Sequence, residues 1–108
     1  MVTITAKAKS VAETAGLAPH FDITTIVGII TAIFQALSAC NPTAPKVHQS
    51  ITRPGILQRR AMKRAIREEI DNPALRPHIE EAVLQVGAAS TQDETSSMYE
   101  EATGAPPA

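Results

Sequence analysis

The chain has 108 residues, a net charge of −1 at pH 7, one cysteine and no tryptophan. This length fits one small domain, and the lone Cys40 excludes an intrachain disulfide and a metal site built from thiolates. Since there is no glycine-rich phosphate loop and no nucleophile beside an evident base, the sequence predicts a non-enzymatic protein without a metal, a cofactor or a small-molecule substrate.

Residues 1–22 are predicted to form an N-terminal arm outside the folded core. Ser10 and Glu13 have the spacing of a helix capping box, but Gly16 and Pro19 leave little room for a long helix. We therefore expect a weak helix or a mobile arm here. A small helical domain over residues 23–88 and a tail over residues 89–108 complete the expected organisation.

Residues 23–40 are the most apolar segment of the chain, and their pattern predicts a helix. Asp22 is well placed to cap the first turn, and large apolar residues recur at spacings of three and four. Eighteen residues at about 1.5 Å each give a helix of about 27 Å, just short of the ~30 Å hydrocarbon layer of a membrane. Asn41 and Pro42 are expected to end it.

One side of this predicted helix carries only small or uncharged polar residues. This association seam consists of Thr24, Gly28, Thr31, Ala32, Gln35 and Ala36. Gly28, Ala32 and Ala36 recur every four residues, which lets two helix backbones approach closely. Thr31 and Gln35 can hydrogen-bond across such an interface. The helix is therefore interpreted as a membrane anchor, as a buried interface in an oligomer or virion, or as the core of a soluble monomer.

The end of the same segment, Leu37-Ser38-Ala39-Cys40, resembles the lipobox of bacterial lipoproteins. That resemblance covers four residues and implies lipidation of Cys40. The preceding sequence departs from a signal peptide, because 22 residues without net positive charge come before the apolar run.

A second helix is predicted over residues 54–71, after a linker at about residues 41–50. Thr52 is a plausible N-cap, and Pro54 suits the first helical turn. Residues 46–76 hold eight basic and three acidic residues, and the basic face of the predicted helix consists of Arg59, Arg60, Lys63, Arg64 and Arg67. This face is interpreted as a solvated surface, as a contact for an anionic membrane or acidic protein, or as a contact for nucleic-acid phosphates. Without interleaved aromatic residues, reading of a nucleic-acid sequence is not predicted.

A third, short helix is predicted over residues 77–87, with Gly87 as its C-terminal cap. Residues 89–108 contain no Val, Ile, Leu or Phe, and residues 77–108 carry six carboxylates and no Lys or Arg. We therefore expect an acidic, disordered tail. Since no segment alternates as a strand does, the sequence predicts an all-α protein of two to three helices.

These features predict a small helical protein that is membrane-associated or self-associating through residues 23–40, with the basic helix beside it. If residues 23–40 span a membrane, the basic residues that follow place the C-terminal part on the cytoplasmic side. One alternative is a structural or interaction subunit of a larger viral or cellular assembly, such as a phage virion component. Another is an electrostatic nucleic-acid binder.

Overall fold

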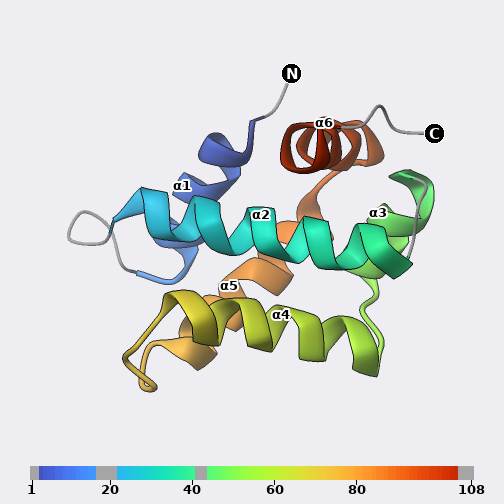
Figure 1. The fold of residues 1–108 in the computed structure, drawn as a ribbon. Helices are drawn as coiled ribbons and strands as arrows, with labels where there is room; N and C mark the ends of the chain where they lie inside the picture. The colour runs from blue at the N-terminus through green and yellow to red at the C-terminus, as the bar shows by residue number, and fades with distance from the viewer. Residues whose placement is uncertain (1–2, 17–21, 41–43, 105–108) are drawn as a thin grey trace.

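The chain forms a bundle of helices in the computed structural model, which describes residues 3–16, 22–40 and 44–104. The helices within these ranges are α1 (Ile4–Thr14), α2 (Ile23–Cys40), α3 (Ala44–Thr52), α4 (Ile56–Glu69), α5 (Arg76–Ala89) and α6 (Gln92–Thr103). Figure 1 shows α2 crossing the middle of the bundle, with α4 on one side of it and α1 and α6 on the other. The predicted all-α class is confirmed. The predicted number of two to three helices is wrong, because the described ranges contain six.

The predicted apolar helix is confirmed as α2, with the predicted bounds. The carboxylate of Asp22 accepts a hydrogen bond from the backbone N–H of Thr24 at 2.9 Å, as a capping residue does. The large side chains of α2 form the centre of the core, and the buried ones are Ile26, Ile29, Ile30, Ile33, Phe34 and Leu37. The helix contacts α1, α3, α4 and α6. Among the described residues, no helix combines the length and the apolar character needed to cross a membrane.

The predicted linker contains a further helix, α3. Pro45 is its second residue, a position where the missing N–H of proline costs no hydrogen bond. Val47 and Ile51 lie four residues apart and are both buried, which fixes α3 on the core. Thr52 is the last residue of α3 and does not cap the next helix. That role falls to Gly55, whose N–H donates to the side chain of Gln58 at 3.0 Å.

Helix α5 is longer than predicted, and Gly87 lies inside it instead of capping it. A Cβ atom placed on Gly87 would lie 2.5 Å from Cγ2 of Ile51, which is closer than two carbon atoms can approach. Glycine at this position therefore allows α3 to pack directly on α5.

The tail predicted to be disordered contains α6. Thr91 and Glu94 form a reciprocal capping box, with hydrogen bonds of 2.9 and 3.2 Å. One stripe of α6 is buried, and its residues are Thr95, Met98, Tyr99 and Ala102. Their spacing of three and four residues places them on one face. The prediction was wrong here because it considered only Val, Ile, Leu and Phe as core residues. Residues 105–108 lie outside the described residues.

The predicted arm contains α1, which is part of the core. Ile4, Ala8, Val11 and Ala12 are buried. The backbone N–H of Ile4 donates to the carboxylate of Glu101 at 2.9 Å, and Nζ of Lys7 lies 3.3 Å from the carboxylate of Glu94. Two acidic side chains of α6 therefore hold α1 in place, although α1 and α6 are the first and the last of the described helices. Residues 1–2 and 17–21 of the predicted arm lie outside the described residues.

Candidate functional site

Some residues of the predicted association seam contact other helices of the same chain, and the others face solvent. Gly28, Thr31 and Ala32 are half-buried, whereas Thr24, Gln35 and Ala36 are exposed. Gly28 faces α4, since a Cβ atom placed on it would lie 3.4 Å from the carboxylate of Glu69. Nε2 of Gln35 donates to the backbone carbonyl of Ala102 in α6 at 3.1 Å. The seam therefore serves two different neighbouring helices of the same chain. The side chain of Cys40, the residue implied by the lipobox resemblance, lies outside the described parts.

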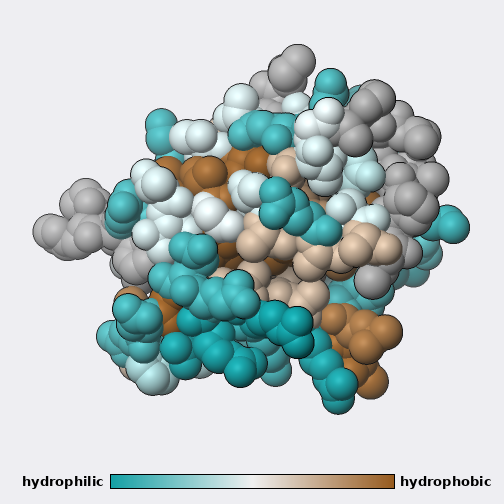
Figure 2. Space-filling view, viewed as in Figure 1, coloured by the Kyte–Doolittle hydropathy of each residue, from teal (hydrophilic) through white to brown (hydrophobic). Residues whose placement is uncertain are grey.

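The predicted basic face is a surface of α4. Its residues Arg59, Arg60, Lys63, Arg64 and Arg67 are all exposed. None of the five forms an ion pair with another described residue. The buried stripe of Met62, Ala65 and Ile66 packs against the core and turns these cations outward. Figure 2 shows the resulting hydrophilic band along the lower side of the molecule, over α4.

Two large exposed aliphatic side chains lie next to this hydrophilic band, at the start of α4. Ile56 is 75% exposed and Leu57 is 70% exposed. Ile56 precedes Arg60 by four residues and Leu57 precedes Arg64 by seven, so the four side chains share one face of the helix. Figure 2 shows an apolar patch beside the hydrophilic band, at the end of α4 that follows α3. Leu57 therefore does not belong to the buried stripe that Met62 and Ile66 form on the same helix.

A shallow pocket lies where α4 and α5 meet, near the other end of the basic face. Lys63 and Arg67 of α4 and Arg76 and Glu80 of α5 contribute its charged residues. Ile66, Pro73 and Pro77 supply apolar lining, and the cavity volume is about 280 Å³. This pocket could not be predicted from the sequence, because it depends on how the Asn72-Pro73 turn returns the chain against α4.

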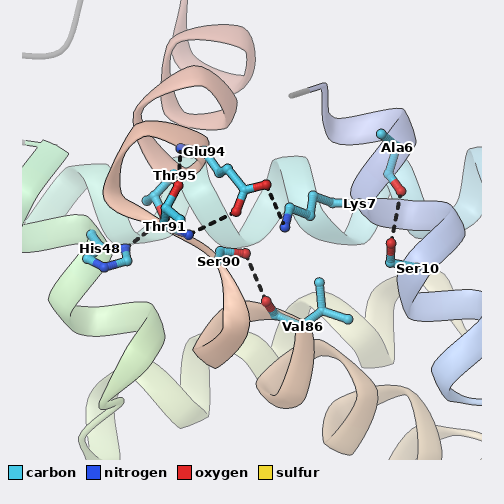
Figure 3. A network of polar contacts seen from close by, with 9 residues as sticks. All are labelled: Ala6, Lys7, Ser10, His48, Val86, Ser90, Thr91, Glu94 and Thr95. Atoms are coloured by element: carbon cyan, nitrogen blue, oxygen red, sulfur yellow. Dashed lines mark hydrogen bonds and ion pairs between the residues drawn. The ribbon is translucent and has the colours of Figure 1, made fainter. Parts of the chain in front are cut away.

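A network of polar contacts on the opposite side of α2 joins α6 to α1 and α3 (Figure 3). Nδ1 of His48 lies 2.9 Å from the hydroxyl of the fully buried Thr95. The backbone N–H of Thr91, followed by Lys7, lowers the pKa of Glu94 from its ordinary value. These contacts attach α6 to α1 and α3. No cluster of His, Cys, Asp or Glu among the described residues could hold a metal ion.

An apolar cavity in the core is too small to be a ligand site. It lies among residues of α1 to α6, including Ile51 of α3 and the buried Met98 of α6, and its volume is about 40 Å³. A cavity of ~150 Å³ is needed to hold a ligand as small as benzene. The surface of α4 is therefore the strongest candidate for a binding site.

The chain matches no protein family, no curated protein and no solved structure.

Proposed function

We propose that this protein is a small non-enzymatic module that binds an anionic membrane surface through the exposed face of α4. The proposal is carried by one observation: five cations that form no ion pair with another described residue share this face with two exposed aliphatic side chains. Cations attract anionic headgroups, and aliphatic side chains enter the boundary between headgroups and acyl chains. The negatively charged cytoplasmic leaflet is the surface on which we expect the protein.

The two kinds of side chain supply comparable free energies of binding. Each Lys or Arg near an anionic surface contributes about 1 kcal/mol, so the basic face contributes about 5 kcal/mol. Burying an aliphatic side chain fully contributes about 1.5 to 3 kcal/mol, so inserting Ile56 and Leu57 about halfway adds about 1.5 to 3 kcal/mol together. Neither term alone is large, and their combination resembles the two signals that stable membrane attachment requires.

This proposal assigns attachment to α4 and leaves α2 in the core. The large apolar side chains of α2 are buried against other helices, so using α2 as an anchor would require the bundle to open. Binding to nucleic-acid phosphates would use the cations of α4 but would leave Ile56 and Leu57 without a role. Base stacking would require exposed aromatic side chains, and Tyr99 is buried.

Vesicle flotation tests the proposal. Vesicles of pure phosphatidylcholine are compared with vesicles that contain 30 to 40% phosphatidylglycerol, and double-stranded DNA is tested in parallel by gel shift. We expect binding to the anionic vesicles only, weakening as salt rises from about 50 to 300 mM but retained in part. Tight binding to DNA with no binding to anionic vesicles would refute the proposal.

Self-association through Ile56 and Leu57 is the competing use of the apolar patch. Light scattering during size-exclusion chromatography separates the two uses, because a patch buried in a dimer cannot enter a membrane. We expect the molar mass of a monomer at the protein concentrations used for flotation. A stable dimer that dissociates when Leu57 is replaced by serine would contradict the proposed orientation on the membrane.

A further inference from the structure

The pocket between α4 and α5 brings together cations from two helices. Lys63 and Arg67 lie one helical turn apart on α4, and Arg76 begins α5 beside them. With Glu80 included, the four charged residues give the pocket a net charge of +2. An anion seated here therefore meets cations from two helices instead of one.

Arg76 is fixed before any ligand arrives. Its Nε donates to the carbonyl of Ile70 at 2.9 Å, and its Nη2 lies 3.5 Å from the carbonyl of Asp71. The side chain is half-buried against the turn that it bridges. A guanidinium group has five N–H donors, so about three remain for a ligand. Holding a donor in place lowers the entropic cost of binding, which a flexible exposed lysine has to bear.

We infer that this pocket binds a phosphate group, and that on a membrane this group is the phosphomonoester of a lipid headgroup. The part concerning lipid rests on the function proposed above. Three cations within one pocket match a group with two negative charges, and a phosphomonoester carries its second charge in part at pH 7. Phosphate oxygens also accept hydrogen bonds from the planar guanidinium fork. A phosphodiester has one charge and fewer terminal oxygens, so it occupies the pocket less tightly.

Glu80 gives the inference a sharp test, because its carboxylate opposes any bound anion. Replacing it with glutamine keeps the size of the side chain and removes the repulsion. Glu81 is the neighbouring residue, is exposed and does not line the pocket. The variant Glu81→Gln changes the net charge of the protein by the same amount and is therefore a matched control.

Binding of inorganic phosphate is measured first, in solution and without lipid. The Nε–H resonance of Arg76 is followed by NMR in ¹⁵N-labelled protein while phosphate replaces chloride at constant ionic strength. We expect saturable shifts that begin at lower phosphate concentration in Glu80→Gln, by about fivefold, and are unchanged in Glu81→Gln. Equal affinities in the two variants would overturn the inference, because only the net charge would then matter. Shifts spread evenly over all of α4 without saturation would overturn it as well.

A pair of double variants then separates the pocket from the rest of the basic face. Lys63→Gln/Arg67→Gln removes two charges from the pocket, and Arg59→Gln/Arg60→Gln removes two charges from the same helix outside it. We expect the first to abolish phosphate binding and the second to retain it within about twofold. Thermal denaturation checks that both variants are folded. Equal loss of phosphate binding in the two would contradict the inference.

Vesicles identify the source of the phosphate. Phosphatidic acid carries a phosphomonoester and phosphatidylglycerol a phosphodiester, and the two are compared at matched surface charge. The wild-type protein is expected to prefer phosphatidic acid by about tenfold, and Lys63→Gln/Arg67→Gln to lose this preference. Saturable phosphate binding without any vesicle binding would reject the proposed function and leave a pocket for a soluble phosphate compound. Vesicle binding without phosphate binding in solution and without a preference would reject the pocket and leave the proposed function.

Discussion

The double substitution Ile56→Ser/Leu57→Ser tests the apolar part of the proposed membrane contact. These side chains are 75% and 70% exposed, so their replacement removes few contacts within the folded protein. We expect the free energy of unfolding to change by less than about 0.5 kcal/mol, as is usual for exposed positions. Any loss of membrane binding then reports on the bound state and not on the fold.

The size of the loss follows from the burial available to the two side chains. Full transfer of an Ile or Leu side chain from water is worth about 1.5 to 3 kcal/mol, and a side chain in the headgroup region gains about half of this. The pair then contributes about 1.5 to 3 kcal/mol, which corresponds to a fall of about 10- to 150-fold in the partition coefficient. Flotation with vesicles that contain phosphatidylglycerol measures this change.

Salt provides the internal control for this measurement. The lost term is hydrophobic, so the ratio of wild-type to variant binding should be the same at about 50 and 150 mM salt. The loss caused by Arg59→Gln/Arg60→Gln should instead shrink as salt rises. Binding of Ile56→Ser/Leu57→Ser that equals the wild type would refute the reasoning. A ratio that falls with salt would show that the variant acts through charge.

Three further predictions concern the bundle, and each is checked by denaturation monitored by circular dichroism. Gly87→Ala should destabilise the protein by about 1 to 3 kcal/mol, because the added Cβ would lie 2.5 Å from an α3 side chain. Gly28→Ala should be neutral or stabilise the protein by up to about 1 kcal/mol, because its Cβ would lie 3.4 Å from the nearest side-chain atom. Equal effects of the two substitutions would contradict the packing described. Met98→Ala should lower the free energy of unfolding by about 2 to 5 kcal/mol, because Met98 is 4% exposed. Glu100→Ala, at an exposed position of α6, should change it little. A Met98→Ala variant as stable as the wild type would mean that α6 does not pack on the core. Glu94 has a pKa lowered by its capping-box and ion-pair contacts, so its stabilising effect is present above about pH 5 and is lost as the pH falls through the lowered pKa. The difference in stability between the wild type and Glu94→Gln should therefore vanish in acid, and a difference that grows on acidification would reverse the assigned direction.

The sequence predicts a helix correctly where several local signals agree with one another. Residues 23–40 have a capping aspartate, an unbroken apolar periodicity and a proline soon after their end, and α2 has these bounds. Residues 54–71 contain α4, and its exposed cations could be read from the spacing of Arg and Lys. In both cases the residues that determine the helix lie within it or within two residues of its ends.

The helices that were missed depend on contacts with distant parts of the chain. Thr95 and Ala102 are weak signals by themselves and become core residues because α2 and α3 lie against α6. The candidate site likewise combines features that the local sequence predicts with features that depend on the packing of the bundle. The five cations were visible as a pattern, whereas the exposure of Leu57 depends on which side of α4 the bundle covers. The approach of Arg76 to Lys63 depends on the path of a turn, which composition does not specify.

The packing of α6 on α2 has a consequence for synthesis on the ribosome. Helix α2 emerges early, but α6, which packs against it, is the last of the described helices to be made. The hydrogen bond from Ile4 to Glu101 likewise joins residues 97 positions apart. The nascent chain therefore carries an apolar helix that is not fully packed until nearly all of the described residues have been translated, and apolar surface exposed during that interval favours aggregation.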